Sequence, residues 1–295
     1  MRSARAATLL LCALVASAVL AGCMSVAPDP DALTDRHGRA GQRGPVVVTT
    51  AEQLWPAFSE LVARTEPELA IAWAPIGRPD AVQVLGSTDT LDAWSTIKVP
   101  IGLAALQAAE GSLPAAAKQD VTDSLTRSDN NSAIRLFRGL SEQGEPALVV
   151  DGVLAANGDP NTRVNAKAFG LTQWSMPDSA RFAAMLPCAA HADEVLQVMG
   201  GVVADQRWGL GKLEHSAYKG GWGASADGYV VRQIGVMRHD LGGGVGVSLL
   251  AQPRDGRHAT ATAALDEAAV WLSQQLTPED SGACPVATDA GTPSP

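Results

Sequence analysis

A serine and a lysine three residues apart, Ser95 and Lys98, stand where an apolar run with helical spacing begins. Residues three apart share one face of a helix, so the lysine amine would lie beneath the serine hydroxyl. A neutral amine in that place can accept the hydroxyl proton and so activate the serine as a nucleophile. A capping serine beside a solvated lysine would give the same pair without any chemistry.

A second polar group, Ser128-Asp129-Asn130, precedes another apolar helical run. Its hydroxyl could relay a proton to a leaving group, and its amide could hold both a lysine and a substrate carbonyl. Ser, Asp and Asn are also the preferred residues at a helix N-cap, and taken alone the group is more typical of a cap.

A third group, Lys219-Gly220-Gly221-Trp222, lies on a predicted strand. Glycines weaken a strand unless another backbone or a ligand must approach closely. A substrate could pair with the main chain along this edge, while the backbone N–H groups of Trp222 and Ser95 form an oxyanion hole. The alternative interpretation is a glycine cluster that only forms a turn.

The elements around these groups follow from the apolar spacing. A helix capped by Thr50 opens the domain, and an amphipathic helix over 258–276 closes it. Two strands are predicted before a long helical stretch and three after it, each bounded by Gly, Pro or Asp. They cover residues 69–76, 81–85, 215–223, 228–237 and 244–250.

This order predicts an α+β domain over residues 49–276. A five-stranded antiparallel sheet is flanked by the N- and C-terminal helices, and an inserted all-helical lobe covers about 99–204. The groove between sheet and lobe is where we expect a ligand site.

The N-terminus carries Arg2 and Arg5, an apolar run over 6–21 and Leu-Ala-Gly before Cys23. This resembles a bacterial lipoprotein signal, which implies that residues 1–22 are removed and that Cys23 carries the lipid. The protein would then be exported and anchored on the extracytoplasmic face of the cell membrane. An ordinary secretory signal and an uncleaved membrane helix are the alternatives, and the run is short for a membrane span.

Residues 23–48 are rich in Pro, Asp, Gly and Arg and predict a flexible tether, while the polar residues 277–295 predict a disordered tail. Beyond Cys23, the mature part keeps only Cys188 and Cys284. An even number of thiols outside the cytoplasm favours one disulfide, which would pin the tail to the body. Two free cysteines are the alternative.

Composition excludes some classes of function. A formal net charge of -9 with no basic stripe argues against nucleic-acid binding. The five histidines have no metal-ligand spacing, and no Gly-x-Ser-x-Gly turn of a Ser-His-Asp hydrolase is present. We expect one compact unit, a monomer, with no metal or cofactor.

In combination, the three motifs resemble the signature of the penicillin-binding and class A β-lactamase-like serine hydrolases: Ser-x-x-Lys, then Ser-Asp-Asn, then Lys-Thr/Ser-Gly. The resemblance covers about residues 49–276. It implies that Ser95 is the nucleophile and Lys98 its base. Ser128 would be the proton shuttle, Asn130 the substrate clamp, and Lys219 the cation that faces the substrate carboxylate.

The sequence departs from this pattern in places. Gly220 stands where the family has Thr or Ser, and Arg232 either supplies the lost carboxylate grip or points outward. The segment between Ser95 and Ser128 is short for a class A enzyme, which implies that a loop that usually walls the cleft is trimmed. If residues 161–165 are the counterpart of the family's Glu-x-x-x-Asn, Asn161 replaces the deacylating Glu, and an amide cannot take a proton from water.

The resemblance implies acylation of Ser95 by β-lactams or by D-Ala-D-Ala-like peptides. Efficient β-lactam turnover is not expected unless Asp159 takes the place of the missing base. The alternative is a catalytically degenerate cell-envelope lipoprotein that binds peptidoglycan peptides or a protein partner.

Overall fold

The computed structural model describes residues 49–87, 90–225, 228–239 and 243–285. By its internal contacts the chain divides into Met1–Gly44 and Pro45–Pro295, and the second unit holds every element described below. The predicted signal peptide, Cys23 and the tether lie outside the described residues.

The main sheet has five antiparallel strands in the order β2-β1-β7-β6-β5. The first strand of the chain therefore lies beside the last, so both ends of the domain build one sheet. The side chains of β1 and β7 are almost all buried, because both faces of the sheet are covered. The strands are β1 Glu68–Pro75, β2 Gln83–Leu85, β5 Ser216–Ser225, β6 Gly228–Arg238 and β7 Gly244–Gln252.

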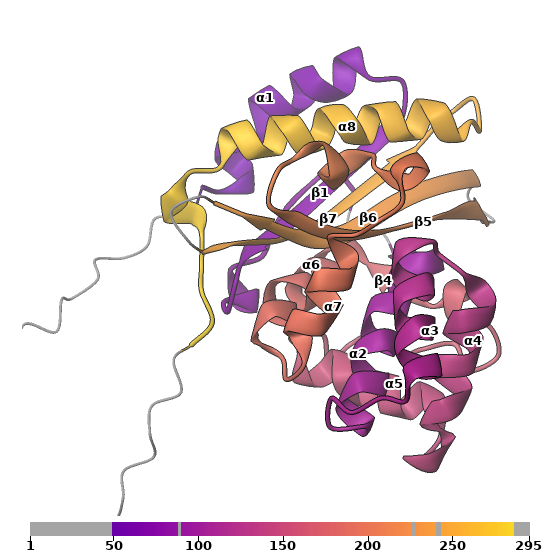
Figure 1. Cartoon of the computed structure of the whole chain (residues 1–295). Coiled ribbons are helices and arrows are strands. Elements are labelled where there is room, and N and C mark those ends of the chain that lie inside the picture. The colour runs from indigo at the N-terminus through magenta and orange to yellow at the C-terminus, as the bar shows by residue number, and fades with distance from the viewer. Residues whose placement is uncertain (1–48, 88–89, 226–227, 240–242, 286–295) are drawn as a thin grey trace, which may run out of the picture. The chain divides into compact units, whose positions relative to one another are not determined.

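Two terminal helices, α1 Ala51–Arg64 and α8 His258–Gln275, cover one face of the sheet (Figure 1). Thr50 caps α1, and its hydroxyl and the Gln53 side chain form a reciprocal capping box. Phe58 of α1 packs on Trp271 of α8 with ring centroids 6.0 Å apart. These contacts join both ends of the domain into one core.

The opposite face is covered by α6 Met176–Met185, which packs on β1 and β7. Gly246 of β7 allows this approach, because a Cβ there would collide with the backbone of Ala184. The helix therefore lies closer to the sheet than any side chain at that position would permit.

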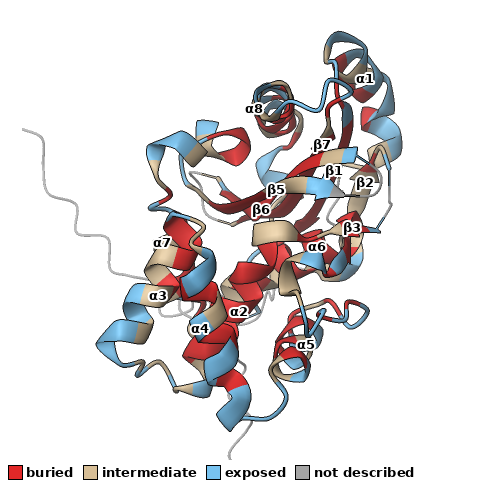
Figure 2. Cartoon of the chain, turned by 90° about the vertical axis from the view of Figure 1, so that its right-hand side faces the viewer, coloured by how far each residue is buried: buried red, intermediate tan, exposed pale blue. Residues whose placement is uncertain are grey.

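The lobe is built around α2 Lys98–Ala108, whose residues are buried from Lys98 through Leu106. A helix that is apolar on all sides must be surrounded, and α2 is (Figure 2). Its neighbours are α3 Ala115–Thr126, α4 Asn130–Gly139, α5 Pro146–Ala156 and α7 Ala192–Met199. Its N-terminus points toward the sheet, which is what places Lys98 at the junction.

The predicted α+β class and the five-stranded antiparallel sheet between terminal helices are confirmed. The prediction of an all-helical lobe is wrong in one respect. Strand β3 Thr90–Asp92 pairs with β4 Gln173–Ser175, and Leu91 lies opposite Trp174. Strands of three residues are too short to show a period of two in the sequence.

The predicted tail is also ordered at its start, so disorder from residue 277 is wrong as far as Pro285. A 3-10 turn covers Pro278–Asp280, and Gly282 forms a β-bridge with Gly244. Asp280 is buried and accepts a hydrogen bond from the Thr49 hydroxyl at 2.9 Å. Polar composition alone did not indicate these long-range partners.

The disulfide between Cys188 and Cys284 is present, with Cα atoms 5.2 Å apart, which confirms that prediction. It fastens the C-terminal segment to the short helical turn Leu186–Cys188 after α6. Within the described ranges, no helix combines the length and apolar character needed to cross a membrane.

We expect the Cys188→Ser/Cys284→Ser double variant to lower the free energy of unfolding by about 2–4 kcal/mol, because the bond closes a long loop in the unfolded chain. The two cysteines are 96 residues apart. Urea unfolding followed by circular dichroism measures the change. Reductant should destabilise the wild type and leave the double variant unaltered, and equal wild-type stability with and without reductant would contradict the prediction.

Candidate active site

Ser95 lies on the 3-10 turn Trp94–Ile97, between β3 and α2. The turn is fixed by hydrogen bonds from Thr96 Oγ1 to Ala93 O at 2.5 Å and from Ala93 N to Thr172 O at 2.7 Å. Trp94 has a φ of 48°, a left-handed conformation that costs energy for a residue with a Cβ. The hydroxyl-bearing residue is thus held on a tight, locally strained turn and remains half-buried.

Strand β5 runs directly against this turn. A Cβ on Gly221 would lie 2.6 Å from the backbone nitrogen of Ser95, and a Cβ on Gly223 would collide with the Trp94 ring. Both glycines therefore permit a close approach between strand and turn, as the sequence predicts for glycines within a strand.

Lys98 is buried, with 1% of its surface exposed. Its Nζ donates to Ser128 O at 2.6 Å and to Asn130 Oδ1 at 2.7 Å. Burial lowers the pKa of Lys98 from 10.5 to about 8, and the nearby Asp129 carboxylate opposes that change. With such a pKa, roughly a tenth of the amine is neutral at pH 7, enough to act as a base.

Lys219 is buried as well, and it reaches Ser128 from the sheet. Its Nζ donates to Ser128 Oγ at 2.9 Å and to Gly220 O at 2.7 Å. Burial, and then repulsion from Lys98, hold the pKa of Lys219 well below its ordinary value. Ser128 thus receives one lysine at its carbonyl and another at its hydroxyl.

The Ser128-Asp129-Asn130 group acts both as a cap and as part of the site. Asp129 caps α4 by accepting a hydrogen bond from Ser132 N at 2.7 Å. Its two neighbours contact the lysines instead. The capping interpretation and the chemical one therefore apply to different residues of the same triplet.

One cleft of about 540 Å³ is lined by Ser95, Lys98, Ser128, Asn130 and Trp222. These five predicted site residues are brought together, Lys219 reaches them through Ser128, and Gly220 and Gly221 form the strand behind. The rest of the lining was not predicted. It consists of Trp94, Arg127, Ile134, Gln206 and residues 167–171.

Several solved structures that share this architecture are described as β-lactamases, some of them as class A. One from Bacteroides cellulosilyticus, described as a representative of class A β-lactamase, has a TM-score of 0.61 at 12% identity and covers 75% of this chain and 96% of its own. The chain has the class A β-lactamase fold.

Two further structures agree. A β-lactamase from Chitinophaga pinensis has a TM-score of 0.59 at 14% identity, covering 75% of this chain and 98% of that one. The β-lactamase from Streptosporangium roseum has 0.58 at 12%, covering 76% and 98%. Searches against protein-family models and curated proteins gave no match. At such identities the likeness shows the fold alone.

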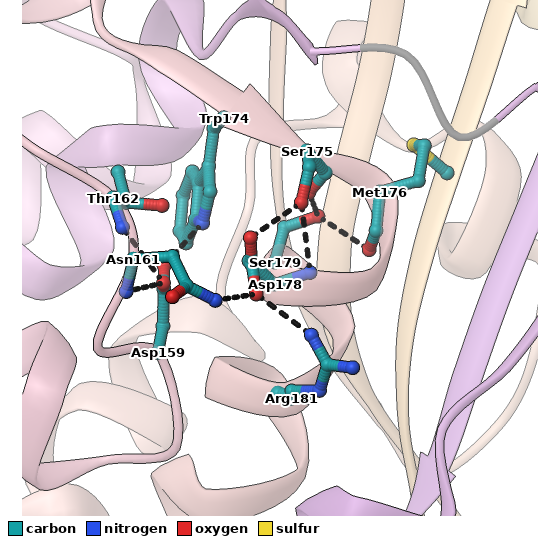
Figure 3. Close-up of polar contacts among 9 residues, drawn as sticks. All are labelled: Asp159, Asn161, Thr162, Trp174, Ser175, Met176, Asp178, Ser179 and Arg181. Atoms are coloured by element: carbon teal, nitrogen blue, oxygen red, sulfur yellow. Dashed lines mark hydrogen bonds and ion pairs between the residues drawn. The ribbon is translucent and has the colours of Figure 1, made fainter.

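Asn161 does not line the cleft of this β-lactamase fold, and Figure 3 shows its contacts instead. Its Nδ2 donates to Asp178 Oδ1 at 3.0 Å, which fixes the loop to the start of α6. Asp159 is fully buried and accepts hydrogen bonds from Trp174 Nε1 at 2.8 Å and from the backbone of Asn161 and Thr162. Neither residue lines the cleft.

The segment that does border the cleft is 167–171, Lys-Ala-Phe-Gly-Leu. It holds no carboxylate, and the described lining as a whole contains no Asp or Glu. Asn165 shapes this segment by accepting hydrogen bonds from the backbone of Lys167 and Ala168. The 167–171 segment is short and has no periodic pattern of apolar residues, so its place at the cleft could not be predicted from the sequence.

Arg232 neither reaches the cleft nor points outward. It is fully buried beneath the sheet, and its Nη1 donates to Leu91 O at 3.1 Å and to Trp174 O at 3.0 Å. Its Nη2 donates to Ser179 Oγ at 3.3 Å. Desolvation lowers the pKa of Arg232 to about 10. The side chain joins β6 to β3, β4 and α6, which support the Ser95 turn.

The missing hydroxyl at Gly220 has a steric cause. A Cβ there would lie 2.6 Å from Cζ2 of Trp208, so the indole fills the space of a side chain. Gln233, opposite Gly220 on β6, fixes the backbone of Trp208 by donating to its carbonyl oxygen at 2.6 Å. Trp208 also packs edge-on against Trp222 at the cleft, with centroids 6.3 Å apart.

A metal has no obvious place here. Among the described residues, no group of three or more His, Cys, Asp or Glu side chains could hold an ion. The polar side chains that line the cleft carry hydroxyl, amine, guanidinium and amide groups.

We expect Gly220→Thr to destabilise the fold by about 1–3 kcal/mol, because the new side chain overpacks against Trp208. Trp208→Ala also destabilises, by leaving a cavity. The Gly220→Thr/Trp208→Ala double variant should be more stable than the sum of the two single effects predicts, since each change relieves the other. Urea unfolding of all four proteins measures the coupling, and strict additivity would contradict it.

Proposed function

We propose that this chain is an active-site serine hydrolase of the penicillin-recognising type, acylated at Ser95 by β-lactams or by D-Ala-D-Ala-like peptides. The observation that carries the proposal is the pair of buried lysines that meet at Ser128, beside a cleft that also holds Ser95. Burying two ammonium groups for structural reasons alone would be costly, whereas catalysis needs lowered amine pKa values.

In the proposed reaction, neutral Lys98 takes the proton from Ser95 as the serine oxygen bonds to the substrate carbonyl carbon. The developing oxyanion is held by the backbone N–H groups of Ser95 and Trp222. Ser128 delivers its hydroxyl proton to the departing nitrogen as the amide bond breaks, and the proton that Lys98 took from Ser95 restores the Ser128 hydroxyl. Lys219 holds Ser128 in position and faces the carboxylate of the substrate.

Hydrolysis of the acyl-enzyme is the slow step in this proposal. A water molecule needs a base to attack the ester, and the described lining of the cleft supplies no carboxylate. Asp159 is tied into three hydrogen bonds away from the cleft, so it does not substitute. β-Lactam turnover is therefore weak or absent, while the acylated protein accumulates.

We also propose that the protein is exported and anchored through a lipid on Cys23, with the domain as a monomer on the extracytoplasmic face of the membrane. The lipoprotein-like sequence before Cys23 supports this. So does the disulfide between Cys188 and Cys284, which persists in oxidising compartments.

A second candidate is a non-catalytic envelope lipoprotein that binds peptidoglycan peptides or a protein partner. Two observations favour it: the Trp208 ring takes the place of the hydroxyl at Gly220, and the cleft lining has no deacylating carboxylate. The lowered pKa of Lys98 favours the enzyme, because binding alone does not need a neutral amine.

We expect incubation with benzylpenicillin to increase the intact mass by one whole penicillin, and we expect this adduct to last. Ser95→Ala should give no adduct, because it lacks the attacking oxygen. Ser141→Ala, on an exposed turn outside the cleft, is the matched control and should label like the wild type. Absence of wild-type labelling supports the second candidate, and rapid multiple turnover contradicts slow hydrolysis.

The acylation rate should rise about tenfold per pH unit below pH 8 and level off above it. The sign follows from Lys98: its pKa is lowered to about 8, so the neutral, proton-accepting form grows as pH rises and dominates above that value. Stopped-flow fluorescence with a reporter β-lactam measures the profile. Lys98→Gln should remove this limb, and a wild-type rate that is flat from about pH 6 to 9 would refute the role of Lys98.

A further inference from the structure

The charged side chains lining the cleft are all cationic: Lys98, Arg127 and Lys167. The whole chain carries a formal net charge of -9, so the cleft has the opposite sign to the protein around it. A cleft lined by one sign of charge concentrates ligands of the other sign. Lys98 and the buried Lys219 belong to the proposed acylation chemistry, which leaves two cations without a role.

The two remaining cations differ in what they already contact. Arg127 has its Nε 3.5 Å from Asp123 Oδ1, and its backbone carbonyl accepts a hydrogen bond from Gln206. Lys167 is exposed, and no carboxylate of the described residues lies within ion-pair distance of its ammonium. Lys167 is therefore the cation available to a ligand.

The backbone that carries Lys167 is fixed at the rim of the cleft. Asn165 Oδ1 accepts hydrogen bonds from Lys167 N at 3.1 Å and from Ala168 N at 3.0 Å. Asn165 N in turn donates to Thr172 Oγ1 at 3.0 Å. Only the lysine side chain has to become ordered when it binds an anion, which limits the entropy lost.

Apolar side chains accompany this cation. Phe169 lies two residues further along the same wall, supported by Phe137 at a centroid distance of 5.4 Å. Leu171, with 44% of its surface exposed, lines the same wall. Trp94 and Trp222 also line the cleft. An apolar body could therefore be buried here with its anionic group at Lys167.

We propose that the preferred acyl donor carries a second anionic group, on an apolar acyl side chain, and that Lys167 binds it. The inference rests on the proposed function, in which Lys219 faces the first carboxylate. The 167–171 wall of the cleft, which lacks a deacylating carboxylate, thus serves recognition. Its lysine attracts the second anionic group of the substrate, which a carboxylate at the same place would repel.

Three penicillins with one nucleus test this. Carbenicillin adds a carboxylate to the benzyl side chain of benzylpenicillin, and ampicillin adds an amine at the same carbon. We expect the second-order rate constant of Ser95 acylation to be highest for carbenicillin, whose extra carboxylate Lys167 attracts, and lowest for ampicillin, whose amine Lys167 repels. The advantage of carbenicillin over benzylpenicillin should be only roughly three- to tenfold, because the Lys167 ammonium is exposed and its interactions are screened by water. The ratio should shrink as salt is raised.

Two variants assign the ratio to Lys167. Lys167→Gln should bring the carbenicillin to benzylpenicillin ratio close to one, and Lys167→Glu should invert it. Lys118→Gln removes the same charge from an exposed position on α3, outside the cleft, and should keep the wild-type ratio. If it also abolishes the ratio, overall charge is responsible and the inference fails.

The outcomes separate this inference from the proposed function. Acylation of Ser95 by all three penicillins at equal rates overturns the role of Lys167 and leaves the serine hydrolase intact. Failure of every penicillin to acylate Ser95 removes the proposed function, and this inference with it.

Discussion

The structure depends on one costly arrangement, two lysines buried against a single serine. Lys98 comes from the lobe and Lys219 from the sheet, and they meet at the carbonyl and hydroxyl of Ser128. Removing an ammonium from water is strongly unfavourable unless hydrogen bonds replace the lost hydration. Asn130 Oδ1 and Gly220 O supply such bonds, and each amine keeps a lowered pKa. A base at neutral pH is thus a consequence of how lobe and sheet meet.

Much of the remaining fold keeps that junction closed. The buried guanidinium of Arg232 bonds to carbonyls of β3 and β4, immediately before and beside the Ser95 turn. Gly221 lets β5 approach the same turn, and Gly246 lets α6 approach β7 from below. These buried contacts hold the Ser95 turn and α6 closely against the sheet beside the two lysines.

The sequence predicted well whatever depended on periodicity or on motifs with fixed spacing. The sheet, the terminal helices, the Thr50 cap and the disulfide follow from patterns that local physics imposes. Ser95 was expected on the same helix as Lys98 and lies instead on the 3-10 turn before it. The sequence predicted poorly what depended on long-range packing. Arg232 could not be placed, since a strand residue with a long side chain fits either face. The 167–171 wall and the ordered start of the tail have no regular pattern, and Asn161 was assigned by spacing although its side chain contacts Asp178.

The departures from the class A β-lactamase pattern differ in how closely they are tied to buried packing. Lys98, Lys219 and Ser128, to which we assign the proton transfer, share hydrogen bonds, so replacing one would leave a buried charge without its partner. Gly220 is buried at the same junction, and the Trp208 ring occupies the space of any side chain there, so this departure is coupled to the core. Lys167 is exposed at the cleft, so a substitution there disturbs no buried packing. The recognition that we propose for Lys167 can therefore change with little effect on stability, whereas the departure at Gly220 cannot.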